Sequence, residues 1–377
     1  MKVSCLQENL AKGLSVVSRA VAARSTLPVL GNILIATDNG RLKLAATNLE
    51  LGITCWIGAK IEEDGATTVP AKTLVDLVNT LPQDKVEMDL TVRTQTLNLS
   101  CGRTQAHIKG IDAQEFPLIP PADLDHALEL NVEDFREMIN QVTFAAATDE
   151  ARPILTGVLA RIDGGQLKLE AADGFRLAVR TAHLSSPPAE PVNAVIPARA
   201  LAELARIIGA EDPVYMSLPP NRGQVIFHHG SVELVSQLIE GMFPDLNAVI
   251  PKNYATRTVL PTDEFRKACR TSVIFAREAA HTARIKIKPG TDLTPGHVTI
   301  TATSAETGDN QAEIDATVDG QPVEIAFNVK YLVDVLNVIK TPNVALETSA
   351  ATSPGVIKPM GANDEYLYVC MPMHLGK

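Results

Sequence analysis

The stretch "FNVKYLVDVLNVI", residues 327 to 339, has two relatives earlier in the chain: "VPAKTLVDLVNTL" at 69 to 81 and "IPARALAELARII" at 196 to 208. Each copy holds a basic residue with an acidic residue four positions later. Apolar residues lie two, five and nine positions after the basic one, which predicts a helix with one buried face and one charged face. The intervals of 127 and 131 residues between copies indicate a repeated structural unit.

A second set of segments repeats at nearly the same period. Each begins with an acidic residue, has an apolar residue two positions later and continues as a predicted helix: "ENLAKGL" (8 to 14), "EDFREMI" (133 to 139) and "DEFRKAC" (263 to 269). An alternating segment repeats too, because "LKLAATNLELGI" at 42 to 53 resembles "LKLEAADGFRLAV" at 167 to 179. A weaker third copy begins at Val298. Several landmarks that agree on one period predict three copies of one domain.

The order of elements within a copy predicts the fold class. A helix is followed by strands with period-two alternation, then by a second helix and further strands. Short connections such as "DNGR" at 38 to 41 predict antiparallel hairpins. We therefore expect an α+β fold of three tandem domains, with helices on one face of antiparallel sheets. Pro-rich stretches place the domains at 1–122, 123–253 and 254–377.

The composition argues against several classes of protein. A net charge of −10 disfavours a protein that coats nucleic acid with its whole surface, and 4% aromatic residues disfavour stacking platforms for single strands. Five widely spaced cysteines without a CxxC motif indicate reduced thiols. The N-terminus does not resemble a signal peptide, and no apolar run approaches the length of a membrane span. We expect a soluble, cytoplasmic protein.

Motifs for catalysis are missing from the sequence. There is no phosphate-binding loop, dinucleotide fingerprint, HExxH or GxSxG motif. The adjacent His228 and His229 are more typical of a strand end than of a metal site. We therefore predict no catalytic residue, no metal and no cofactor. Two alternatives stay open, namely a hydrolase that uses Asp173 with a histidine, and a scaffold of tandem domains that does not bind DNA.

The charge is unevenly distributed between predicted helices and the rest of the chain. The six predicted helices sum to a formal charge of +2, so the remainder carries −12. Lys72, Arg199 and Lys330 hold equivalent positions in the three copies. They would form ordinary ion pairs with the acid four residues on, or would make a repeated row that follows a phosphate backbone without reading bases.

Segments along the whole chain resemble one known family. They are "TLPVLGNILI" (26 to 35), "GATTVPAKTL" (65 to 74), "ADGFRLAV" (172 to 179), "FPDLNAVIPKN" (243 to 253), "AFNVKYLVDVLN" (326 to 337) and "YVCMPMHL" (368 to 375). In this order they resemble the bacterial sliding clamps, the beta subunits of DNA polymerase III. The resemblance implies a non-enzymatic processivity factor: a head-to-tail homodimeric ring, helices inside, that encircles double-stranded DNA without sequence specificity. It also implies partners, namely the replicative polymerase, the clamp loader and other proteins with a clamp-binding motif.

The resemblance assigns functional positions residue by residue. The DNA-facing positions it implies are Arg24, Lys72, Arg152 and Arg199. The implied partner-peptide pocket, between domains 2 and 3, consists of Leu155, Gly174, Phe175, Arg176, Leu177, Pro244, Val249, Val369, Met371, Pro372, Met373 and His374. Phe175 stands where many members have histidine and Ala248 replaces a basic residue, so the pocket should be more apolar. At the dimer interface the resemblance sets Ile108 against Ile274 and Phe275, with Ala106 in place of a larger residue.

Overall fold

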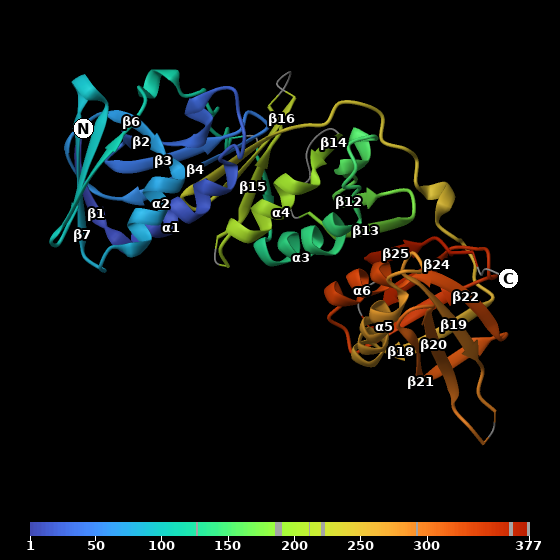
Figure 1. The fold of residues 1–377 in the computed structure, drawn as a ribbon. Helices are drawn as coiled ribbons and strands as arrows, with labels where there is room; N and C mark the ends of the chain where they lie inside the picture. The colour runs from blue at the N-terminus through green and yellow to red at the C-terminus, as the bar shows by residue number, and fades with distance from the viewer. Residues whose placement is uncertain are drawn as a thin grey trace. The chain divides into compact units, whose positions relative to one another are not determined.

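The computed structural model describes the chain except residues 126, 185–190, 211, 220–222, 292, 362–364 and 375–377. It forms two compact units (Figure 1). One comprises Met1–Glu133 with Glu203–Leu238, and the other Asp134–Ala202 with Ile239–Lys377. The strand pairs between named strands are all antiparallel, as the predicted hairpins require.

The first unit contains two sheets. The smaller has the order β5 (Lys60–Glu63), β1 (Lys2–Leu6), β7 (Lys85–Thr91), β8 (Thr96–Cys101) and β9 (Thr104–Lys109). The larger has the order β10 (Leu128–Leu130), β15 (Val214–Ser217), β16 (Gln224–His229), β17 (Val232–Gln237), β4 (Leu51–Gly58), β3 (Arg41–Thr47), β2 (Asn32–Asp38) and β6 (Ala66–Pro70). Helices α1 (Gln7–Val17) and α2 (Ala71–Thr80) lie side by side (Figure 1), and α1 packs on β4.

The second unit contains one long sheet. Its order is β14 (Val192–Pro197), β11 (Gly157–Asp163), β12 (Gln166–Ala172), β13 (Arg176–His183), β25 (Tyr366–Cys370), β24 (Gly355–Pro359), β23 (Asn343–Thr348), β18 (Thr256–Pro261), β21 (Gly308–Gly320), β20 (Gly296–Ser304), β19 (Thr282–Lys288) and β22 (Val323–Asn328). Helices α5 (Thr262–Ala276) and α6 (Val329–Val338) pack against each other. The remaining helices, α3 (Val132–Val142) and α4 (Ala198–Ile207), cross the division between the units.

The sequence pattern predicted the turns and helices well. Asn39 and Gly40 both have positive φ, at 46° and 77°, which is the geometry of a two-residue hairpin turn. In the repeated helices, Leu74, Leu201 and Leu332 are fully buried, as the apolar spacing predicts. The α+β fold of repeated helices and antiparallel sheets is therefore confirmed.

The apolar face of α2 is shifted slightly from the predicted one. Leu77 is only half-buried, whereas Val78 is fully buried. Val78 lies one helical turn after Leu74, so these two side chains share the face toward the core. The division into domains 1–122, 123–253 and 254–377 stays a prediction, because β17 and β25 carry the sheets across both boundaries.

All five cysteines are buried free thiols. Burial raises the pKa of Cys5 and of Cys370 to about 12, which keeps both thiols protonated and unreactive. Among the helices that the structure describes, none is long and apolar enough to cross a membrane.

A buried arginine joins β13 to α6. The side chain of Arg176 is 11% exposed; its Nε lies 2.9 Å from an Asp173 carboxylate oxygen and its Nη1 lies 2.6 Å from one of Asp334. The guanidinium also lies over the rings of Tyr331 and Phe144, at 4.3 and 5.5 Å from their centroids. Burial alone would lower the pKa of Arg176, but Tyr368 and the two carboxylates raise it, so the charge is retained.

Replacing this arginine should destabilise the second unit. We expect Arg176→Met to lower the free energy of unfolding by about 2 to 3 kcal/mol, because it leaves Asp173 without its cation, while the partly exposed Asp334 recovers some hydration. Arg284→Met, which removes an exposed ion pair with Glu324, is the matched control and should cost less than about 1 kcal/mol. Denaturant unfolding of both variants measures the difference. Equal effects would show that the buried network adds nothing.

Candidate functional site

The end of the chain is held in place by backbone hydrogen bonds. Strand β25 pairs with β13, so that Val369 lies opposite Leu177. Beyond the strand, the Met371 N–H donates to the Phe175 carbonyl at 2.8 Å, and the Met373 N–H donates to the Ala326 carbonyl at 2.7 Å. The "CMPM" segment is therefore an ordered edge of the site.

An apolar floor lies beneath this segment. One buried cluster consists of Ala172, Leu177, Val179, Val356 and Val369, and a second of Leu155, Leu159, Val195 and Phe243. Leu246 packs against both clusters, which joins them into one surface. Leu155, Leu177 and Val369 are thus core residues as well as predicted pocket residues.

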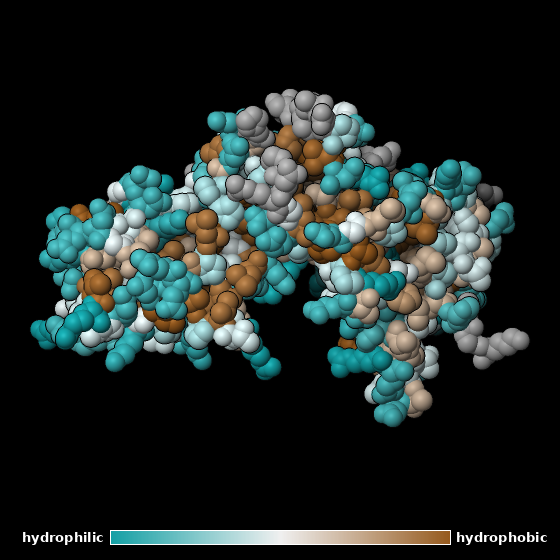
Figure 2. Space-filling view, turned by 90° about the horizontal axis from the view of Figure 1, so that it is seen from above, coloured by the Kyte–Doolittle hydropathy of each residue, from teal (hydrophilic) through white to brown (hydrophobic). Residues whose placement is uncertain are grey.

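Three of the predicted pocket residues expose apolar side chains. Phe175 is 57% exposed, Val249 44% and Met371 38%. Pro244 and His374 are exposed as well, and Pro372 and Met373 are half-buried. Apolar residues appear between hydrophilic ones on the face seen in Figure 2, so exposure alone does not mark a site. A backbone hydrogen bond joins Phe175 to Met371 beside the clustered Leu177 and Val369, and Val249 precedes Ile250, which packs against the same cluster.

A tight turn between β12 and β13 presents Phe175 outward. The Asp173 carboxylate accepts hydrogen bonds from the backbone N–H groups of Phe175 and Arg176, at 2.8 and 3.0 Å. Gly174 has φ of +93°, and a Cβ there would lie 3.1 Å from the Arg152 guanidinium. The backbone conformation therefore favours a glycine, whereas the contact with the flexible Arg152 side chain could be relieved by a small shift.

Linker residues Leu246 and Ile250 pack against the buried clusters of the candidate site but were not among the predicted residues. Leu246 follows Phe243 by three positions, as Ile119 follows Phe116 in the preceding linker. Ile119 covers Gly52, with side-chain atoms 3.3 to 3.4 Å from where a Cβ would stand. The repeated Phe-Pro step with an apolar residue shortly after it was the signal that could have identified Leu246.

The repeated basic residues occupy one structural position. Lys72, Arg199 and Lys330 are each the second residue of a helix and are exposed. The acids four positions later bind other arginines in two of the copies: Glu203 binds Arg19 and Arg206, and Asp334 binds Arg176. Among the described residues, Lys330 forms no ion pair with Asp334.

The other predicted contacts are placed as follows. Arg24 is exposed, and Arg152 is exposed but donates to the Asp173 carbonyl at 3.1 Å. Ile108 on β9 is already buried within its own chain, whereas Ile274 on α5 is 56% exposed and Phe275 is half-buried. Of these three, Ile274 has the most apolar surface left to bury against a partner.

The family comparisons cover the chain in three consecutive segments. Residues 1–120 match the model for the DNA polymerase III beta subunit, N-terminal domain. Residues 129–245 match its central domain, and residues 247–374 match its C-terminal domain. The three models occur in their natural order.

Full-length relatives agree with these matches. The beta sliding clamp of Synechococcus elongatus is 33% identical over 381 residues, with all of both chains covered, and that of Staphylococcus aureus is 32% identical over 94% of both. Among solved structures, the DNA polymerase sliding clamp of Bacillus subtilis superposes with a TM-score of 0.93 at 27% identity, over the full length of both chains. A Pseudomonas aeruginosa sliding clamp bound to griselimycin gives 0.91 at 29%, again over the full length of both chains. The chain therefore belongs to the bacterial DNA polymerase III beta subunit family, and is a DNA sliding clamp, a non-catalytic processivity factor of that polymerase.

Proposed function

We propose that this clamp acts as a ring of two copies, closed head to tail around duplex DNA, and that it tethers the replicative polymerase through the pocket beside β25. The clamp loader and other proteins with a clamp-binding motif would use the same pocket, in the bacterial cytoplasm. The proposal rests on a strand junction that occurs twice within the chain, between β17 and β4 and between β25 and β13. The equivalent strands β9 and β21 are left to form a third junction with another copy.

The two internal junctions have the same register. In the first unit, Gly52 of β4 pairs with Thr47 of the neighbouring strand and, on its other side, with Val235, the fourth residue of β17. In the second unit, Leu177 of β13 pairs with Ala172 and, on its other side, with Val369, the fourth residue of β25. The last strand of one repeat therefore extends the sheet of another in a fixed way.

Two edges are left to form the third junction. Strand β9 lies at the edge of its sheet, and within the described ranges β8 is its only strand partner apart from an isolated bridge beyond its end. In β21, Gly308–Ala316 pairs with β20 and Thr317–Gly320 pairs with β18. Within the described ranges, the edge of Gly308–Ala316 that faces away from β20 has no strand partner. By the pattern of the other junctions, β9 of one copy would pair with β21 of a second copy. Two such junctions would close a ring and would cover the free edges of β9 and β21 in each copy.

Side chains support this pairing. The outward-facing side of β9 carries His107 and Lys109, whereas the outward-facing side of β21 carries Asp309, Glu313 and Asp315. The two edges thus have complementary charge, which favours correct association over alternatives. On the inward side, Ile108 would approach Ile274 and Phe275 of the second copy, and the small Ala106 adds little apolar area.

Duplex DNA would be held by charge without base contacts. Lys72, Arg199 and Lys330 present a cation at the same position of three repeated helices, and Arg24 and Arg152 would add to them. Contacts of this kind follow the phosphate backbone, are weak and depend strongly on salt. Such attraction allows the ring to slide.

The pocket suits short apolar peptides. Leu155, Leu177 and Val369 form a preformed floor, while Phe175, Val249 and Met371 offer exposed apolar surface around it. The remaining walls would come from Gly174, Pro244, Pro372, Met373 and His374, with Arg176 fixing the turn that carries Phe175. Flexible methionine side chains can adapt to several partner sequences.

The ring predicts a topological link to DNA. After loading by the clamp loader of the same organism, the protein should remain on a nicked circular plasmid through gel filtration, and should be lost once a restriction enzyme linearises the plasmid. The same result is expected for the Lys72→Ala and Lys330→Ala double variant, because linkage does not depend on these charges. Equal loss from circular and linear plasmid would contradict the ring.

The pocket predicts a local effect on partner binding. Phe175→Ser should weaken binding of a clamp-binding peptide from the polymerase subunit about tenfold or more, because it removes a large apolar contact at the rim. Leu293→Ser is the matched control: this leucine is 94% exposed and lies outside the pocket, so binding should not change. Fluorescence anisotropy measures both. Unchanged affinity in Phe175→Ser would exclude it from the pocket.

A further inference from the structure

We infer that His107 of one copy and Asp309 of the next form a pH-dependent contact that tightens the ring as the pH falls. The inference rests on the head-to-tail ring proposed above. It names a pair of residues that would regulate closure of the ring in this chain.

The register of the internal junctions selects this pair. In the first repeat, the junction residue is Gly52 of β4, which lies opposite Thr47. In the second repeat it is Leu177 of β13, which lies opposite Ala172. The position in the third repeat equivalent to Thr47 and Ala172 is Thr303. Thr303 pairs with Asp309 on β21. Because the junction residue pairs with the fourth residue of a last strand, and the fourth residue of β9 is His107, the register sets His107 opposite Asp309.

The direction of the side chains agrees with this register. On β9, Ala106 and Ile108 pair with the buried Leu99 and Leu97, so His107 faces the opposite side of the sheet. On β21, the Asn310 amide donates to the Ser272 hydroxyl of α5, so Asn310 faces the helices and Asp309 faces away from them. Opposite residues of an antiparallel pair share a face, so a shift of register by one residue would set His107 against a helix-facing residue.

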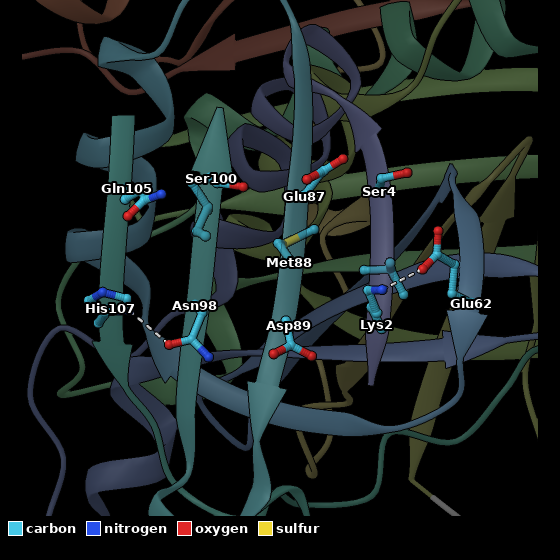
Figure 3. Close-up of a pocket in the computed structure, with 12 residues that line it drawn as sticks. Lys2, Ser4, Glu62, Glu87, Met88, Asp89, Asn98, Ser100, Gln105 and His107 are labelled. Carbon is cyan, nitrogen blue, oxygen red and sulfur yellow. Dashed lines mark hydrogen bonds and ion pairs between the residues drawn. The ribbon is translucent and has the colours of Figure 1, made fainter. Parts of the chain in front are cut away.

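His107 is exposed and has one polar partner among the residues that the structure describes. Its Nδ1 lies 2.8 Å from the Asn98 side-chain oxygen on β8 (Figure 3), which leaves Nε2 available. Asn98 pairs in turn with Asp89 on β7. Figure 3 also shows Gln105 on β9 and, farther across the same sheet face, Glu87, Lys2 and Glu62, the last two joined as an ion pair. Lys109 lies two residues along β9 on the same face.

The opposing strand β21 is acidic, whereas β19, farther across the same sheet face, carries Arg284, Lys286 and Lys288, of which Arg284 is paired with Glu324. Across the junction, His107 would meet Asp309, with Thr307 and Gln311 as diagonal neighbours, Glu306 in the turn before β21, and Glu313 farther along the strand. Glu313 lies near a histidine of its own chain, because a carboxylate oxygen is 3.9 Å from His297 Nε2. Both residues of that contact belong to the same copy, so association of two copies leaves it unchanged.

The sign of the effect follows from these charges. Carboxylates are ionised over the range in which histidine ordinarily changes its charge. The protonated imidazole gains a carboxylate only when the ring closes, so closed rings bind this proton more tightly than separate copies. By linkage, closure is favoured at lower pH, and this contribution is lost as the pH rises.

The effect of the contact on the free energy of association is modest at each junction. The ring has two identical junctions, so this free energy is doubled and the fold-change in affinity is squared. An exposed ion pair changes association about two- to fivefold. The dimer dissociation constant should therefore fall about four- to 25-fold between pH 8 and pH 6.

The test is the dissociation constant of the full chain, measured by sedimentation or by exchange of fluorescent subunits at pH 6 and pH 8 and constant ionic strength. His107→Asn keeps the polar contact to Asn98 and should abolish most of the pH dependence, as should Asp309→Asn. His107→Lys should hold association tight at both pH values. His297→Asn is the matched control and should behave as the unchanged chain does.

The outcomes separate this inference from the ring itself. A dimer whose dissociation constant is the same at pH 6 and pH 8, or whose pH dependence survives in His107→Asn, overturns the contact but leaves the ring intact. Absence of a dimer at every pH overturns the ring.

Discussion

The structure depends on one backbone interaction, the antiparallel ladder between the last strand of one repeat and the fourth strand of another. This ladder joins β17 to β4 and β25 to β13, and so carries each sheet beyond a single repeat. It explains why the compact units do not follow the sequence repeats. Hydrogen-bonded strands form denser contacts than the linkers that separate the repeats along the chain, so the sheets decide which parts stay together.

The same ladder creates the candidate peptide site. Because Leu177 and Val369 are opposite each other across a junction, their side chains form one floor, and the chain that leaves β25 passes beside the turn that holds Phe175. A site built in this way needs no catalytic group. Its specificity would come from the exposed side chains around the floor, of which Phe175 is the largest.

Much of this was predictable from the sequence. Periodicity identified the repeated helices and hairpins because burial of one face imposes a local pattern, as Leu74 and Leu332 illustrate. The pairing of Arg176 with Asp334 was not predictable, since Asp334 is 158 residues away and no pattern links the two. Leu246 was missed for a related reason: a linker has no periodicity, so only its recurrence after Phe-Pro marked it. The residues assigned to the site by resemblance remain a prediction where function is concerned.

The charge network around Arg176 also affects the surface charge of helix α6. In the third repeat, Asp334 binds Arg176, and Lys330 forms no ion pair among the residues that the structure describes. A structural arginine in the sheet thereby leaves a cation available on a helix. This coupling between the core network and the surface charge could not be seen in the local sequence.

The central claim is that β9 of one copy pairs with β21 of the next in the register of the internal junctions. Cysteines at Ala106 and Asn310 test it directly, because residues opposite each other in an antiparallel pair have Cα atoms about 4.5 to 5.5 Å apart, within the range a disulfide spans. The five native cysteines are buried and should not compete. Mild oxidation should give a covalent dimer in the Ala106→Cys/Asn310→Cys variant, and little product in Ala106→Cys/Gln311→Cys, whose second cysteine faces the other side of the sheet. Failure of the first pair to cross-link, or a ladder of larger products in place of a closed dimer, would contradict the account.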